Sequence, residues 1–280
     1  MVENGDAALG SKSSPIELTA DCANCFGLCC VAPSFAKSAD FAIDKRAGQP
    51  CPNLMSNFGC GIHETLRQQG FPGCTTYDCF GAGQHVAQTT FAGHSWRDDP
   101  ESASAMFAAF DVMRQLHELL WHLNEARALG AAASLRDWID RAFVQTEDLT
   151  NASPETLVNL DVDAHRQSVN AILLQASELA RASAPQRRDY RRADLVGVDL
   201  THTDLRGANL RGAALVGANL SRSDLRLADF TGADLRGCNL TAADLSTALF
   251  LTQAQLDAAT GDSETHLPPA HRRPAHWTTT

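Results

Sequence analysis

Eight of the nine cysteines in this 280-residue chain lie between positions 22 and 79. The densest part reads "CANCFGLCC", where the C-x-x-C spacing lets two sulfur atoms converge on one ion from a tight turn. Phe26-Gly27 gives that turn its freedom. Cysteines acting as small apolar side chains would explain one or two thiols, but not eight. We therefore expect this segment to bind a metal; its cysteines are Cys22, Cys25, Cys29, Cys30, Cys51, Cys60, Cys74 and Cys79.

The identity of the metal stays open at this point. Eight thiolates could fill two separate zinc sites, or four could hold an iron–sulfur cluster and leave four for a second centre. An iron–sulfur cluster or iron is our first expectation, and zinc is the alternative. The pair Cys29-Cys30 argues against one mononuclear site, because neighbouring side chains on an extended segment point apart. His63 and His85 are candidate substitutes for a cysteine ligand.

Composition indicates a globular chain, with 44% hydrophobic and 20% charged residues. No apolar run approaches the roughly 20 residues that cross a bilayer. The first fifteen residues lack the basic start and apolar stretch of a signal peptide. We therefore expect a cytoplasmic protein without membrane contact, in a compartment where thiols stay reduced and disulfides are disfavoured.

The net charge of −10 is unevenly distributed. Residues 190–250 carry seven Asp and seven Arg, which cancel. Because no basic stripe could follow a phosphate backbone, direct nucleic-acid binding is disfavoured.

The segment after the cysteines, residues 98–183, has helical periodicity. Asp99 is the expected N-cap of the first helix, with Pro100 at its first position. Apolar residues then recur at steps of three and four, and "LRDWIDRAFVQTEDL" repeats this pattern. Ser153-Pro154 opens a third helix that runs to about Arg181. Three amphipathic helices with short connections predict a small bundle.

The third segment changes period completely. From Leu195 to Phe250, Leu or Phe stands at every fifth position, usually after a small residue and then Asp or Asn. Neither a helix nor a flat strand keeps every fifth residue inward, but a square coil with four sides of five residues does. Twelve units predict about three coils. Cys238 takes the small inward position, and Phe230 and Phe250 suggest a locally wider shaft.

This pattern resembles the pentapeptide-repeat family, whose consensus is A-(D/N)-L-x-x, over residues 193–250. The resemblance implies a right-handed quadrilateral β-helix. His202, Arg222 and Leu227 stand where Gly often turns the corner. We expect the Asp and Asn side chains to hydrogen-bond the turn backbone. "TQAQLDAATG" should form a capping helix closed by Gly261, which protects the open end of the solenoid.

The cysteine segment also resembles a known family. "CANCFGLCC", "AGQPCPNL", "FGCGIHETL" and "GFPGCTTYDC" look like the zinc- or iron-chelating CxxCxxxCC (YkgJ-like) family. All eight cysteines fall on cysteine positions of that pattern, so the resemblance implies that they are the ligands. The family has no single agreed reaction, and the resemblance implies a metal and little more.

The expected architecture is α+β. In chain order it comprises a disordered tail (1–19), a cysteine-rich metal-binding domain (20–97), a helical bundle (98–183), a linker (184–192), the pentapeptide-repeat β-helix (193–251), a capping helix (252–262) and an extended tail (263–280).

Three functions fit these features. The first is a metal-binding interaction or regulatory module with a protein partner, in which the β-helix serves as a rigid post. The second is an iron-dependent or iron–sulfur redox enzyme with its active site at the cysteines, although the chain has no nucleophile–base motif. The third is a DNA mimic that protects topoisomerases, which the short, charge-neutral repeat region disfavours. Some pentapeptide proteins pair through the C-terminal cap, which would give a homodimer.

Overall fold

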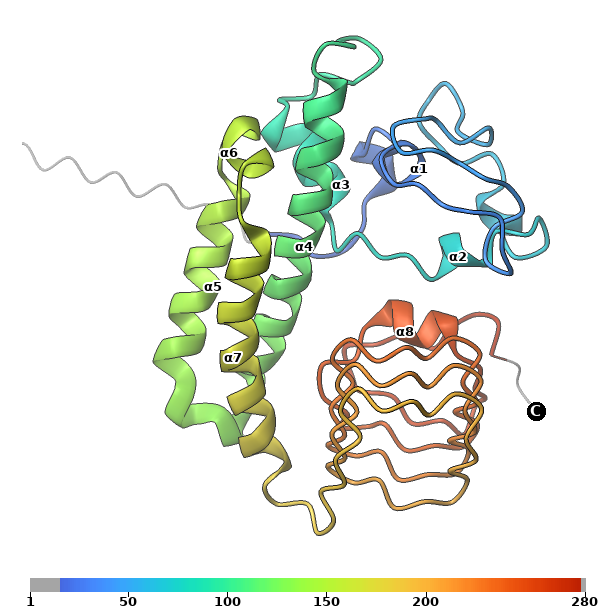
Figure 1. Cartoon of the computed structure of the whole chain (residues 1–280), viewed down its shortest axis with the longest axis vertical. Helices are drawn as coiled ribbons and strands as arrows, with labels where there is room; N and C mark the ends of the chain where they lie inside the picture. The colour runs from blue at the N-terminus through green and yellow to red at the C-terminus, as the bar shows by residue number, and fades with distance from the viewer. Residues whose placement is uncertain (1–15, 278–280) are drawn as a thin grey trace, which may run out of the picture.

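A computed structural model describes residues 16–277 of the chain (Figure 1). Most of the expected tail, residues 1–15, lies outside the described residues. Thr19 lies against a later segment, because the Gln84 side chain donates to its carbonyl at 2.8 Å. Among the described residues no helix combines the length and apolarity needed to span a bilayer. The helices are η1 (Cys22–Asn24), α1 (Leu28–Val31), η2 (His63–Thr65), α2 (Pro72–Thr75), α3 (Ala82–Gln84), the π-helix η3 (His85–Thr90), α4 (Ala103–Ala128), η4 (Gly130–Leu135), α5 (Arg136–Thr150), α6 (Pro154–Val158), α7 (Val162–Arg181) and α8 (Gln253–Ala258).

Helix α4 lies at the centre of the fold and contacts α5, α6 and α7 (Figure 1). The sequence predicts that this helix begins at Pro100. In the structure it begins at Ala103, because a turn that starts at Ser95 precedes it. The amides of Asp98 and Asp99 both donate to the Ser95 carbonyl, at 3.1 and 3.0 Å. The apolar stripe itself is confirmed: Met106, Phe110, Met113, Leu116, Leu120 and Leu123 are all buried.

The expected third helix is in fact two helices, α6 and α7. Asp161 interrupts it, because its side chain accepts the amide of Ala164 at 3.0 Å and so caps a new helix. Ser153 caps α6 in the same way, through the amide of Thr156 at 3.2 Å.

The cysteine segment shares a hydrophobic core with α4. Leu28 and Val31 of α1 pack in one buried cluster with Met106, Phe110 and Met113 of α4. The expected boundary between residues 97 and 98 therefore separates two stretches of sequence, but not two cores. This sharing fixes the position of the cysteines against the helices.

The repeat region forms stacked coils joined by isolated parallel bridges. Asp194 pairs with Ala214 and Asp199 with Asn219, an offset of 20 residues in each case, as four sides of five residues require. The residues that replace glycine at corners have the same left-handed backbone as the glycines. Arg222 has φ 58° and Leu227 has φ 59°, against 66° for Gly197. The Asp and Asn ladder bonds the turns as predicted; Asp194, for example, accepts the amide two residues later at 3.2 Å.

The ladder extends beyond the predicted limits at both ends. It begins inside the expected linker, where the amide of Tyr190 donates to Asn209 at 2.8 Å. It continues past α8, because Asp244 is bridged to His266. The expected extended tail instead packs on the coils as far as Trp277, which is 5% exposed and donates its indole N–H to Ala259 at 3.1 Å. Covering the last coil in this way satisfies backbone groups that an open edge would expose.

Phe230 and Phe250 have different roles, and the expectation of a wider shaft is wrong for the second. Phe230 packs among the leucines of the shaft. Phe250, with φ 55°, instead joins the core formed by α4, α5 and α7, and Leu251 enters the shaft cluster. The ring of Phe250 lies 5.8 Å from that of His122 on α4. The last repeat unit therefore joins the β-helix to the helices.

A buried polar junction surrounds this aromatic contact. Glu125 of α4 accepts the backbone amide of Phe250. Asp229 is fully buried and pairs with Arg211 at 3.1 Å, and it also accepts the hydroxyl of Ser177 on α7. Burial raises the pKa of Glu125 to about 7, while its bond to the Phe250 amide acts in the opposite direction and the charge of Asp229 raises the pKa further.

This junction predicts a pH dependence of stability. Glu125 keeps its proton in the folded state up to about pH 7, but loses it near pH 4.5 when unfolded. The contribution of Glu125 to the free energy of unfolding is therefore fully present below pH 4.5 and is lost as the pH rises to about 7. Its upper limit is about 3 kcal/mol. Thermal melts of Glu125→Gln, which keeps an acceptor for Phe250, should lack this decline relative to the unmodified protein.

The matched control is Glu101→Gln, an exposed glutamate outside the junction. It should follow the unmodified protein at every pH. Equal pH profiles for Glu125→Gln and the unmodified protein between pH 5 and 8 would contradict the assignment.

Candidate metal centre

Four of the predicted ligands line one small cavity. Cys22, Cys25, Cys29 and Cys79 surround a space of about 20 Å³, together with residues that include Gly83 and Phe110. That volume is enough for one ion or one water molecule. We call these four cysteines the first set.

The local backbone explains how the first set converges. Asp21 caps the short helix η1 by accepting the amide of Ala23 at 3.0 Å, and so orients Cys22. The expected freedom of the turn after Cys25 is confirmed, since Gly27 has φ 64°. A Cβ at that position would lie 2.6 Å from Leu54, so the turn also needs the missing side chain. The chain then enters α1, which carries the two adjacent cysteines.

Cys29 and Cys30 lie on a helical turn and not on an extended segment as expected. Their sulfur atoms are 3.9 Å apart. Cys29 belongs to the first set. Cys30 instead contacts the loop that carries Cys51, because the Cys51 amide donates to the Cys30 carbonyl at 2.9 Å. The adjacent pair thus connects two groups of thiols.

The remaining four cysteines, Cys30, Cys51, Cys60 and Cys74, form the second set. An antiparallel bridge joins Cys60 to Leu54, and Leu54 lies three residues after Cys51. Burial raises the pKa of Cys74 to about 12, and the charges of Cys30, Cys51 and Cys60 add to the effect. The Cys51 amide bonds the Cys30 carbonyl and the next loop carries the bridge to Cys60, so these three cysteines lie on neighbouring loops.

Burial and repulsion also act on the first set. Burial raises the pKa of Cys25 to about 11, with contributions from Cys79 and Cys22. The thiolate form of these residues is therefore disfavoured unless a positive charge is nearby. Cys30 is the exception: the bond to the Cys29 thiol lowers its pKa to about 7, and Lys45 acts in the same direction.

Lys45 is a feature of the site that the sequence did not indicate. The residue is 5% exposed, and its ammonium group donates to the carbonyls of Val31, Arg46 and Gln49 at 2.9, 3.2 and 3.0 Å. Burial lowers its pKa, and the charges of Cys51, Cys30 and Cys29 raise it. A buried cation with all its hydrogen bonds made offsets the negative charge of neighbouring thiolates.

The two candidate histidine ligands lie in different surroundings. His63 is exposed on η2. His85 faces the core, where its Nδ1 is 3.1 Å from Nε2 of His117, and its own Nε2 is buried without a hydrogen-bond partner. His117 is fully buried and its other nitrogen bonds the Phe80 carbonyl at 2.7 Å, next to Cys79. Burial lowers the pKa of His117 to about 4, and burial also lowers the pKa of His85.

Across residues 16–277 no group of three or more His, Cys, Asp or Glu side chains is already arranged to hold a metal ion. The nine cysteines, Cys238 included, are free thiols. Cys238 itself is buried in the shaft of the β-helix, as predicted. Thiol donors in groups of four have the chemistry that zinc and iron require. Ligands of this kind become organised as they bind and lose their protons.

The family match concerns the repeat region. Residues 193–232, 215–250 and 223–260 match the family described as pentapeptide repeats, in eight copies. Solved relatives include a pentapeptide repeat protein of the Arabidopsis thaliana thylakoid lumen, at 28% identity, 31% coverage of this chain, 55% of that chain and TM-score 0.23. Another is HetL of Nostoc sp. strain PCC 7120, which is involved in heterocyst differentiation regulation. It is 34% identical, the match covers 31% of this chain and 38% of that chain, and the TM-score is 0.24.

A curated relative matches a longer part of the chain. The uncharacterized protein YybG of Bacillus subtilis (strain 168) is 53% identical over 168 residues, which are 60% of this chain and 60% of that protein. The chain thus spans about 60% of the length of this relative. The family match and the 20-residue ladder agree over the same residues. This chain therefore carries a pentapeptide-repeat domain, folded as a β-helix.

Proposed function

We propose that the protein is a metal-binding pentapeptide-repeat protein whose first and second cysteine sets each hold one metal centre. The observation that carries the proposal is the cavity lined by Cys22, Cys25, Cys29 and Cys79. Its volume suits a single ion better than a larger cluster, which favours a four-thiolate zinc or iron ion in this set. The second set, with Cys30 next to Cys29, supplies four more thiols.

The role that we assign to these centres is structural, in an interaction or regulatory module. The 20–97 segment contains only short helices, so its loops need further contacts to hold them in position. Metal ions bound by cysteines from distant loops would supply those contacts. The β-helix, covered by α8 and the C-terminal residues, then provides a rigid face for a protein partner.

A redox enzyme is the second candidate, and one observation favours it. Tyr77 and Asp78 lie between Cys74 of the second set and Cys79 of the first, and both line a cavity of about 910 Å³. A substrate in that cavity would lie beside the segment that joins the two sets. Iron in these sites would supply electron transfer.

The DNA-mimic function gains no support from the surface of the β-helix. Most of its carboxylates are paired with arginines, for example Asp204 with Arg206 at 2.7 Å and Asp234 with Arg236 at 2.6 Å. A row of neutralised carboxylates does not reproduce the charge of a phosphate backbone.

Elemental analysis tests the proposal directly. We expect about two metal ions per chain. The double variant Cys25→Ser/Cys79→Ser should lose about one of them. The double variant Cys51→Ser/Cys60→Ser should lose the other. Chelation should lower the melting temperature. Cys238→Ser is the control, because this thiol lies in the β-helix shaft, and it should keep the full metal content.

The absorption spectrum separates the candidates. A colourless zinc protein supports the structural role, and a brown protein with iron and sulfide supports the redox role and contradicts single ions. A folded, metal-free protein whose melting curve ignores chelators would falsify both.

Gly83 provides a steric test of the first set. A Cβ at this position would lie 2.6 Å from the sulfur of Cys25, so Gly83→Ala should displace that ligand. We expect loss of about one metal ion per chain and a destabilisation of about 1–3 kcal/mol, measured by elemental analysis and thermal melting.

Gly130→Ala is the matched control, because a Cβ there meets nothing within 4 Å. It should keep the full metal content, with stability unchanged or slightly higher. If Gly83→Ala also binds both ions at normal affinity, Cys25 is not a ligand.

A further inference from the structure

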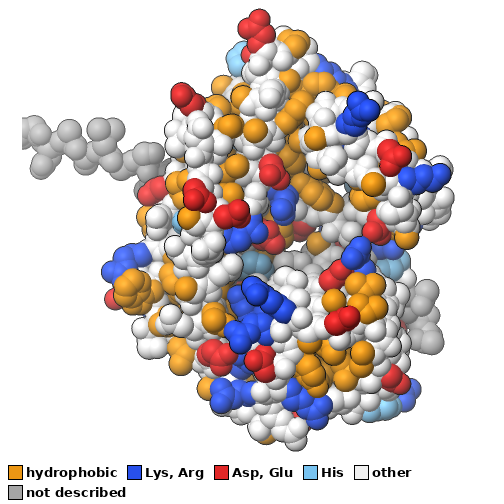
Figure 2. Space-filling model, viewed as in Figure 1, with side chains coloured by type: hydrophobic (Ala, Val, Ile, Leu, Met, Phe, Trp, Pro, Cys, Tyr) orange, Lys and Arg blue, Asp and Glu red, His pale blue; other side chains and the backbone are white. Residues whose placement is uncertain are grey.

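A cavity opens between three parts of the chain. It has a volume of about 910 Å³ and is bounded by the cysteine segment, by one face of α4 and by the start of α8 at Thr252 and Ala254. Figure 2 shows the surface hollowed at this junction, with acidic and basic side chains around it. Cavities of this size hold small organic molecules.

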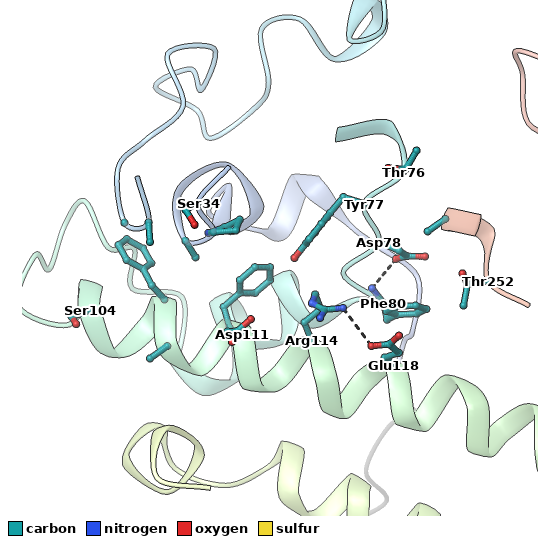
Figure 3. A pocket seen from close by; sticks show the side chains of 18 residues that line it. Ser34, Thr76, Tyr77, Asp78, Phe80, Ser104, Asp111, Arg114, Glu118 and Thr252 are labelled. Carbon is teal, nitrogen blue, oxygen red and sulfur yellow. Dashed lines mark hydrogen bonds and ion pairs between the residues drawn. The ribbon is translucent and has the colours of Figure 1, made fainter. Parts of the chain in front are cut away.

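The walls of the cavity combine aromatic rings with carboxylates. Tyr77, Phe80, Phe107 and Phe110 supply the rings. In Figure 3, Tyr77 points from the cysteine segment toward α4, where Asp111 and Arg114 lie. Aromatic faces attract cations as well as apolar groups. These walls can therefore enclose a ligand with an apolar body and a positive charge.

The charge of the cavity favours a cation over an anion. Three carboxylates line it, those of Asp78, Asp111 and Glu118, and among the described lining residues Arg114 is the one basic side chain. Arg114 is paired with Glu118 at 3.4 Å, so its charge is already balanced within α4. Asp78 and Asp111 remain, the first on the cysteine segment and the second on α4 (Figure 3).

Asp78 is held in place by the backbone. Its Oδ1 accepts the amide of Phe80 at 2.7 Å. The carboxylate of Asp78 is half-buried and lines the cavity. A half-buried carboxylate is stabilised by a cation placed beside it.

We propose that this cavity binds a small organic cation, an amine or guanidine with an apolar body, between Asp78 and Asp111. The apolar body contacts the aromatic wall, and the cationic group lies between the two carboxylates. This site goes beyond the metal centres and does not require them to be redox-active. Because Tyr77 and Asp78 lie between Cys74 and Cys79, an occupied cavity also contacts the segment that joins the two cysteine sets.

Isothermal titration calorimetry on the full-length purified protein tests the site. The probes are phenethylammonium, agmatine as a guanidinium, the neutral 2-phenylethanol and the anionic phenylacetate. We expect either cation to bind more tightly than 2-phenylethanol, and phenylacetate to bind most weakly. Asp111→Asn should weaken cation binding about fivefold, as expected for a partly solvated charge pair.

Asp137→Asn is the matched control, an exposed aspartate on α5 that does not line the cavity. It should leave the cation affinities unchanged. Equal affinity for 2-phenylethanol and phenethylammonium, tighter binding of phenylacetate, or no binding of either cation at 10 mM would each overturn the proposal. The metal content of the same samples is measured separately, so loss of the metal proposal and loss of this one are distinguishable.

Discussion

Burial of two successive stretches of α4 in two different cores is the constraint on which the rest of the structure depends. Met106, Phe110 and Met113 pack against the cysteine segment. Leu119 and Leu123, further along the helix, join the core that α5, α7 and Phe250 complete. A helix buried in this way cannot shift toward one partner without exposing apolar surface on the other. The cysteine segment, the bundle and the β-helix are therefore positioned by a single element.

The repeat region shows how far a short period can specify a fold. Because the side-chain pattern returns every fifth residue, the ladder of Asp194, Asp199 and their partners 20 residues later follows from the sequence. The corners also follow, even where Leu227 must adopt a left-handed backbone. The ends could not be predicted, because Tyr190 and His266 bond to the ladder through backbone groups, which carry no residue signature.

The cysteine segment is the opposite case. Its eight thiols could be singled out as candidate ligands because of their type and number, but its loops have no hydrophobic period from which to derive their positions. The division into two sets depends on the helical turn at Cys29 and Cys30, which brings residues far apart in sequence together. The role of Lys45 could not be predicted either, because it depends on three carbonyl acceptors and not on the residues next to Lys45 in the sequence.

The polar residues of α4 extend this argument to function. Asp111 and Glu118 border the large cavity, His117 bonds the carbonyl that follows Cys79, and Glu125 holds the last repeat unit. An occupant of the cavity, the loop of the first cysteine set and the docking of the β-helix are thus joined to one rigid helix. Because these contacts share one helix, a displacement of that helix would disturb all of them together. The shared helix gives a physical reason for the cysteine segment and the repeat domain to occur in one chain.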